Sequence, residues 1–240
     1  MSNKPKRRPS HSSRIAEAAD ARRSRTGLII GLVAGAVVIA LVMALLLSRG
    51  SEEITATEPT VEAGTAALPE YPPPAADGTQ PADPAVGRPA PIVSGEQFDG
   101  APITLPDSGR PAVIVFLAHW CPHCQAEVPR IVADIEANGM PDDVDLFGVA
   151  TANDPSRPNY PPDEWLEGER WTIPTLVDKG NSAAELYGLS GFPYFVVVDA
   201  EGNVVERVSG ELSIEAFNNL IEAARTGTPS PITQGPSSPR

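Results

Sequence analysis

The chain has 240 residues, enough for one domain of ordinary size with appendages. Its two cysteines, Cys121 and Cys124, are too few for a structural disulfide framework or a four-cysteine zinc site. The net charge of −13 is unevenly spread, because residues 1–27 carry eight Lys and Arg against two acidic residues. The acidic remainder argues against nucleic acid as a partner.

Residues 28–47 contain neither a charged residue nor a proline. As a helix, this stretch would span about 30 Å, the thickness of the hydrocarbon core of a bilayer. It is longer than the apolar region of a signal peptide, and no small-residue cleavage site follows it. The basic residues before it place the N-terminus in the cytoplasm by the positive-inside rule. We therefore expect an uncleaved, single-pass anchor in the lipid bilayer, with the basic tail over residues 1–27 in the cytoplasm and the rest outside.

Two other stretches lack the apolar residues that a core requires. Residues 48–85 are rich in Pro, Ala, Glu and Thr, and this composition predicts a disordered linker that lifts a domain off the membrane. Residues 227–240 are rich in Pro and Ser and are expected to be a disordered tail. The folded domain is thus predicted over residues 86–226.

Within this domain, apolar runs and breakers predict alternating strands and short helices. A helix with apolar Val128, Ile131 and Ile135 on one face is expected after residue 121 and ends near Gly139. A last helix begins after the cap residue Ser213. The other predicted elements are strands at 102–105, 112–117, 144–150, 175–177, 195–199 and 204–208, and short helices at 163–168 and 182–187. This order describes an α/β fold around a mixed central sheet.

The two cysteines lie where the buried strand 112–117 passes into the first long helix. Cys121 is expected at the helix cap and Pro122 at the first helical position, where its missing N–H costs nothing. The free N–H groups and the dipole of a helix N-terminus stabilise an anion, here the thiolate that attacks disulfides. We predict that Cys121, at the exposed helix tip, is the nucleophile. Cys124, one turn further on, is predicted to be the resolving thiol with the higher pKa.

Two histidines flank this pair. His123 would favour the Cys121 thiolate if it carried a positive charge, or it is merely a solvent-exposed turn residue. His119 is expected to lie on the surface. Two cysteines with a histidine between them could form half a metal site, but the sequence offers no second pair of ligands. Covalent haem attachment needs a histidine where Gln125 stands.

These features carry a resemblance to a known family. The strand, the motif Trp120-Cys121-Pro122-His123-Cys124 and the helix resemble the thioredoxin superfamily. Val86-Gly87-Arg88-Pro89-Ala90-Pro91, the Glu127-Val128-Pro129 run and Gly191-Phe192-Pro193 are similar to its membrane-anchored TlpA/ResA branch, over roughly residues 86–226. The resemblance implies a thioredoxin-like three-layer sandwich and thiol–disulfide chemistry that uses neither cofactor nor metal. The Cys-Pro-His-Cys tetrad also resembles the oxidising site of DsbA-type enzymes.

The resemblance further implies a cis-proline loop that faces the cysteines. Both Ile173-Pro174-Thr175 and Gly191-Phe192-Pro193 fit such a loop. We expect Pro193, because the required strand, hairpin and helix follow only this proline. The backbone of Phe192 would then pair with a substrate strand. Relatives carry a small or β-branched residue before this proline, so Phe192 departs from the pattern.

Glu127 matches the acidic residue of the TlpA/ResA signature. It could relay protons to the buried thiol if burial raises its pKa, or it is an ordinary exposed helix residue. Plain thioredoxins carry a buried Asp on the central strand, where Val115 stands here. The resemblance implies that Glu127 takes over its role.

The sequence therefore predicts a membrane-tethered thiol–disulfide oxidoreductase outside the cytoplasm. It would act on protein thiols or disulfides through a mixed disulfide, as a reductase or as an oxidase, and a membrane redox partner would recycle it. A peroxiredoxin-like peroxidase is an alternative, but it needs Thr and Pro where Ala118 and Ile114 stand. A Sco-type copper carrier is another, but it needs Cys-x-x-x-Cys and a distant histidine.

Overall fold

The computed structural model describes residues 35–43, 54, 56–62, 65–107 and 109–231. The chain divides into two compact units, residues 1–52 and 53–240. In the first unit, residues 35–43 are helical. The rest of the predicted anchor 28–47 and the basic tail 1–27 lie outside the described residues. Over the ranges that are described, no helix combines the length and the apolar character needed to cross a membrane.

A five-stranded sheet in the order β6-β5-β4-β7-β8 forms the centre of the second unit. β4 runs parallel to β5, which runs parallel to β6, whereas β7 runs antiparallel to both β4 and β8. The predicted mixed sheet is thus confirmed. The strands are β4 (Ala112–Leu117), β5 (Asp145–Ala150), β6 (Thr175–Val177), β7 (Tyr194–Val198) and β8 (Val204–Ser209).

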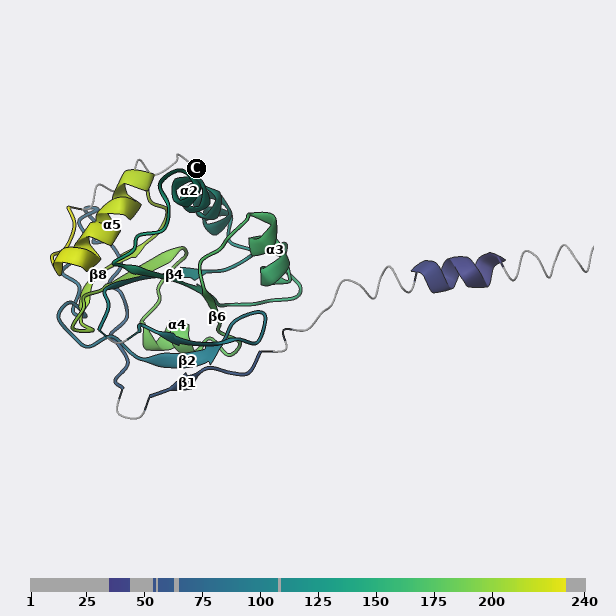
Figure 1. Cartoon of the computed structure of the whole chain (residues 1–240), viewed down its shortest axis with the longest axis horizontal. Coiled ribbons are helices and arrows are strands. Elements are labelled where there is room, and N and C mark those ends of the chain that lie inside the picture. The colour runs from purple at the N-terminus through teal and green to yellow at the C-terminus, as the bar shows by residue number, and fades with distance from the viewer. Residues whose placement is uncertain (1–34, 44–53, 55, 63–64, 108, 232–240) are drawn as a thin grey trace, which may run out of the picture. The chain divides into compact units, whose positions relative to one another are not determined.

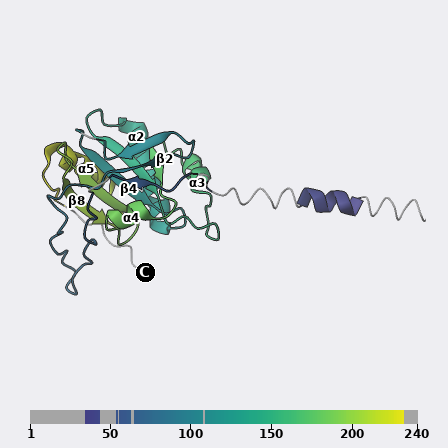
Figure 2. The same ribbon diagram turned by 90° about the horizontal axis from the view of Figure 1, so that it is seen from below.

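Helices cover one face of this sheet, and a helix and a small sheet cover the other (Figure 1). Val113, Val115 and Leu117 of β4 pack with the first layer, and the alternate residues of β4 pack with the second, as the period of a strand requires. Figure 2 shows from below that α4 lies in front of the central sheet. The first layer holds α2 (Pro122–Asn138), α3 (Pro162–Gly168) and α5 (Ile214–Thr226), and the second holds α4 (Ser182–Leu186).

The small sheet is antiparallel, in the order β1-β2-β3. The sequence predicted β3 (Pro102–Leu105) but neither β1 (Thr60–Val61) nor β2 (Val93–Glu96). β1 has only two residues, and in β2 Val93 alone is buried, so neither strand has an apolar pattern.

The prediction of a disordered linker over residues 48–85 is wrong for much of its described part, which includes β1 and a packed segment before residue 86. Leu68, Tyr71 and Ala85 are buried in the second layer of the core. The backbone N–H groups of Leu68 and Tyr71 donate to carbonyls of residues 186 and 188 at 2.8 and 2.9 Å. Asp83 also forms a buried ion pair with Arg207 of β8. These contacts join residues more than a hundred positions apart in the sequence, which a composition-based prediction cannot detect.

The C-terminal helix follows the sequence prediction closely. Ser213 caps α5, and its Oγ accepts a hydrogen bond from the N–H of Ala216 at 3.1 Å. Within the predicted tail 227–240, residues 227–231 are described, and the N–H of Ser230 donates to Glu206 at 2.9 Å. Residues 232–240 lie outside the described residues.

Candidate active site

The two cysteines occupy the junction of β4 and α2 as the sequence predicts. Cys121 is the N-cap of α2 with an extended backbone (φ −78°, ψ 119°), and Pro122 begins the helix. The prediction of an exposed helix tip is wrong, however, because Cys121 is only 6% exposed. The loop before β7 approaches it, and the Cys121 thiol lies 3.9 Å from the carbonyl oxygen of Phe192. Cys124, one turn further on, is fully buried, and both residues are free cysteines.

The surroundings shift the pKa values of these two thiols in opposite directions. The pKa of Cys121 is lowered to about 6, first because the Cys124 side chain hydrogen-bonds its sulfur. The N–H groups of Cys124 and His123 and the charge of His123 act in the same direction, whereas burial opposes them. The pKa of Cys124 is raised by the hydrogen bond to Cys121 and by burial. The arrangement therefore favours a thiolate on Cys121 and a neutral thiol on Cys124.

The loop that faces Cys121 is the one that contains Pro193. The Phe192–Pro193 bond is cis, and the Phe192 carbonyl is the group that meets the Cys121 thiol. The alternative, Pro174, lies beside β6, where its carbonyl accepts a hydrogen bond from Gly148 at 2.8 Å. Of the two candidate prolines, Pro193 is therefore the one whose loop meets Cys121, as the choice of Pro193 expected.

Trp120, the residue before Cys121, packs against Phe192, whose carbonyl meets the Cys121 thiol. Their rings meet edge to face with centroids 5.9 Å apart, and both are partly buried. The indole N–H of Trp120 donates to the Ala152 carbonyl at 2.8 Å, which fixes the ring. The exposed Arg157 places its guanidinium 4.3 Å above the Trp120 ring. Sequence reasoning missed Arg157, which lies in a proline-rich segment without periodicity.

The prediction of a surface position for His119 is wrong. Its side chain is 1% exposed, and burial lowers its pKa. Nδ1 contacts the Pro158 carbonyl oxygen at 2.7 Å, and Nε2 accepts from the N–H of Asp154 at 3.2 Å. These partners require a neutral ring with the proton on Nδ1. The carbonyl of His119 also accepts hydrogen bonds from Gln125 and Asn159. Through these hydrogen bonds, His119 holds residues 154–159, which precede α3, against the junction of β4 and α2.

Glu127 is buried rather than exposed on its helix. Its side chain is 1% exposed, and Oε2 accepts from the N–H of Leu212 at 2.9 Å and from Arg130 at 3.0 Å. Burial raises its pKa, although these two partners oppose the shift. The sequence left burial and exposure open, and the structure shows the buried arrangement that a proton relay needs.

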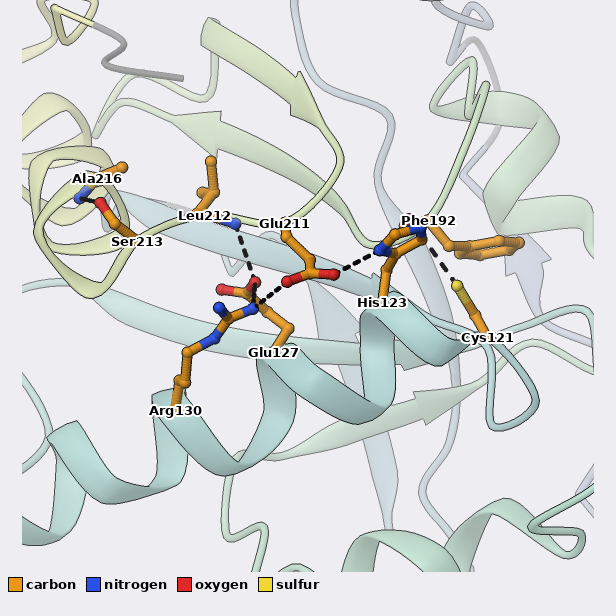
Figure 3. A network of polar contacts seen from close by, with 9 residues as sticks. All are labelled: Cys121, His123, Glu127, Arg130, Phe192, Glu211, Leu212, Ser213 and Ala216. Carbon is orange, nitrogen blue, oxygen red and sulfur yellow. Dashed lines mark hydrogen bonds and ion pairs between the residues drawn. The ribbon is translucent and has the colours of Figure 1, made fainter. Parts of the chain in front are cut away.

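His123 is exposed, and it pairs with an acidic residue from the loop between β8 and α5. Nδ1 of His123 contacts Oε1 of Glu211, and Oε2 of Glu211 accepts from Arg130 at 2.7 Å (Figure 3). The hydrogen bond to Glu211 is the main reason why the pKa of His123 is raised. No sequence pattern points to Glu211, which lies 88 positions from His123. The contact between Arg130 and Glu127 could have been predicted, because oppositely charged residues spaced i,i+3 on a helix are neighbours.

In the described part of the chain, no three His, Cys, Asp or Glu side chains come together in a way that could hold a metal ion. The corner of the fold around Cys121 thus combines two thiols of unequal acidity, a buried carboxyl group and an ion-paired histidine.

Comparison with known proteins places this chemistry in a family. A sequence profile of the Redoxin family matches residues 85–221. The methylamine utilization protein MauD of Methylophilus methylotrophus is 28% identical over 60% of this chain, and the match spans 64% of MauD, less than two thirds.

Two further relatives carry names that describe thiol chemistry. The sporulation thiol-disulfide oxidoreductase A of Bacillus subtilis is 24% identical over 52% of this chain and 74% of its own length. The thiol-disulfide oxidoreductase ResA of Bacillus thuringiensis is 24% identical over 57% of this chain and 77% of its own length. The resemblance to the ResA branch is therefore confirmed. With its mixed sheet and its cysteine pair at the start of α2, the chain belongs to the Redoxin family of the thioredoxin superfamily.

Proposed function

We propose that this protein is a thiol–disulfide oxidoreductase that oxidises protein thiols outside the cytoplasm and is held at the membrane by residues 28–47. One observation carries the direction. The Cys121 sulfur lies at the N-terminus of α2, where a thiol, two backbone N–H groups and a cationic histidine all stabilise its thiolate. The disulfide form carries no charge there and gains none of these interactions. Stabilising the reduced form makes the disulfide a stronger oxidant.

The exchange of sulfur–sulfur bonds takes place at the cysteines themselves. A substrate thiolate attacks Cys121 in the Cys121–Cys124 disulfide, and Cys124 leaves with the electron pair of the broken S–S bond. A second substrate thiolate then attacks the substrate sulfur of the mixed disulfide, and Cys121 leaves as a thiolate. The substrate loses two electrons and two protons: both electrons and one proton stay on the protein, with the proton on Cys124, and the second proton goes to the solvent. A membrane redox partner that accepts two electrons would restore the disulfide.

Glu127 fits the role of proton donor to Cys124. The raised pKa of Cys124 makes its thiolate a poor leaving group unless a proton arrives with the electron pair. Glu127 is buried three residues further along the same helix, and burial raises its pKa, which favours proton exchange with Cys124. In the opposite direction, the same carboxylate would remove that proton.

Reduction of protein disulfides is the second candidate, and the acidity of Cys121 supports it. With a pKa of about 6, Cys121 is largely a thiolate at neutral pH and can attack a substrate disulfide directly. Glu127 would then deprotonate Cys124 so that it resolves the mixed disulfide. Both directions use the same residues, so the reduction potential decides between them.

The membrane location rests on the sequence. The uncharged residues 28–47 follow a basic tail, which supports a cytoplasmic N-terminus and an extracytoplasmic catalytic unit. The substrates would accordingly be extracytoplasmic proteins with free or paired cysteines.

The test compares the two redox states of residues 53–240, the compact unit that includes the packed segment before residue 86. We expect the reduced form to unfold at a higher denaturant concentration than the oxidised form at neutral pH. The entropic gain from the disulfide opposes this, but it is small for so short a loop. A difference of about 1.4 kcal/mol corresponds to about 30 mV in potential. His123→Ala should narrow the difference, because it removes one stabilising charge. An oxidised form that is clearly more stable would reject the oxidase in favour of the reductase.

A further inference from the structure

Glu211 lies outside every motif of the sequence, yet it contacts the active-site helix twice. It follows β8 and precedes the cap residue of α5, and its side chain is one-third exposed. One carboxylate oxygen contacts Nδ1 of His123, and the other accepts from Nη2 of Arg130 at 2.7 Å (Figure 3). A single carboxylate thus joins two cationic side chains of α2.

The side chains of α2 that contact Glu211 or its neighbour Leu212 form a row along the helix. His123, Glu127 and Arg130 are spaced i, i+4, i+7 and therefore share one helix face. Nη2 of Arg130 also donates to Glu127 at 3.0 Å, and Glu127 accepts from the N–H of Leu212, the neighbour of Glu211. The contacts run without a break from His123 through Glu211 and Arg130 to Glu127.

The two ends of this row lie next to the two cysteines. The charge of His123 acts on Cys121, and the charge of Glu127 acts on Cys124. We infer that Glu211 is a positioning residue of the redox site, which keeps His123 charged beside Cys121 and shares Arg130 with Glu127 beside Cys124. The inference rests on the proposed function only in taking these two cysteines as the reacting pair, and it holds for either direction.

The sign of the effect follows from the order of the charges. His123 lies between Glu211 and Cys121 (Figure 3), so its nearer positive charge outweighs the more distant carboxylate. Without Glu211, His123 loses the hydrogen bond that contributes most to raising its pKa, so less of it is positively charged at a given pH. The thiolate of Cys121 would then be less stable. From the facing segment, Arg157 stacks on Trp120, and Asp154 contacts His119 through its N–H. Replacing Glu211 leaves both of these in place.

The experiment measures how fast iodoacetamide alkylates Cys121 in the reduced full chain as the pH is varied. In Glu211→Gln, we expect the midpoint of the rate profile to rise by roughly half a pH unit or more. Glu201→Gln is the matched control, because Glu201 is an exposed residue of the β7–β8 turn. Its midpoint should equal that of the unmodified protein. An unchanged midpoint in Glu211→Gln would overturn the inference.

Glu211→Gln is also made in a His123→Ala background. This double variant shows whether Glu211 acts on Cys121 through His123 or only by stabilising the fold. If Glu211 acts on Cys121 through His123, Glu211→Gln should shift the midpoint no further once His123 is gone. An equal shift with and without His123 would show that Glu211 acts through the general structure, which overturns the route proposed here.

A measurement that does not depend on the Glu211 variant guards against its misfolding. The proton NMR signals of the three histidines can be followed against pH, and His123→Ala identifies the signal of His123. We expect His123 to titrate above its ordinary pKa of 6.5. Titration at or below that value would overturn the inference. Neither the alkylation profile nor the histidine titration uses a substrate or a redox partner. A negative result in them would therefore reject the role of Glu211 and leave the proposed function standing. A failure of the proposed function would likewise leave the role of Glu211 standing.

Discussion

Two thiols on one helix turn hold their protons with unequal strength because they meet different groups. Cys121 caps the helix and receives N–H donors and a positive charge, whereas Cys124 lies inside the core and faces a carboxyl group. The first can therefore leave or attack as a thiolate at neutral pH, and the second reacts only when its proton is moved. This difference in acidity between the two thiols leads to two predictions.

The first prediction concerns which cysteine meets the substrate. In Cys124→Ser, a mixed disulfide between Cys121 and a substrate has no thiol to resolve it, so substrates should remain trapped on the protein. Cys121→Ser should trap far fewer, since Cys124 is fully buried. Non-reducing electrophoresis of both variants, purified after acid quenching, measures the difference. Equal trapping by the two variants would contradict these roles.

The second prediction concerns pH. Folding lowers the pKa of Cys121 from 9.0 to about 6, so its stabilisation is present above the unfolded value and is lost as the pH falls through about 6. The stability of the reduced form relative to the oxidised form should therefore increase between about pH 6 and pH 9. Above that range, the raised pKa of Cys124 has the opposite effect.

Urea unfolding of both redox states at several pH values tests this dependence. The comparison between the states cancels the contribution of titratable groups that lie far from the cysteines and are present in both. A stability difference that stays constant over this range would show that the Cys121 pKa is not shifted by folding.

At the scale of elements, local patterns predicted what local forces determine. The cap and first turn of α2, the Ser213 cap of α5 and the buried run of β4 depend on neighbouring residues, and all three match the structure. The burial of His119 depends instead on Pro158, 39 positions away, and the charge of His123 depends on Glu211. Partners that only the tertiary fold brings together leave no periodic signal, so the site was predicted in its cysteines but not in its ion pairs.

The segment before residue 86 shows the same limit and leads to a third prediction. Asp83 is the carboxylate that neutralises Arg207, whose side chain is fully buried. Asp83→Asn would leave that guanidinium buried without its charge partner and should lower the free energy of unfolding by about 3–5 kcal/mol. The midpoint of urea unfolding measures this effect.

The exposed Glu70 of the same segment offers a matched control. Glu70→Gln should change the free energy of unfolding by no more than about 0.5 kcal/mol. If both variants were equally stable, the segment would not be held by its buried ion pair. A domain shortened to begin at Val86 should show a defect at least as large as that of Asp83→Asn.

At the scale of the whole molecule, the fourth prediction concerns topology. A basic tail before an uncharged stretch predicts one membrane crossing, with everything after residue 47 outside the cytoplasm. A reporter that is active only outside the cytoplasm should therefore be active when it is fused after Arg240. The same reporter fused after Gly27, with the rest of the chain removed, should be inactive. Activity of a cytoplasmic reporter at Arg240 would reverse the orientation.

The packing of residues 65–85 also determines where the catalytic unit can bear mechanical load. These residues lie in the core layer of α4 and the small sheet, whereas α2 with the cysteines belongs to the opposite layer. A pull on the chain from its N-terminal side would first reach the two-residue strand β1 and then the Asp83–Arg207 pair. The central sheet separates both from the cysteine pair. Tension from a tether would therefore loosen the fold from the far side of the sheet before it disturbed the thiols.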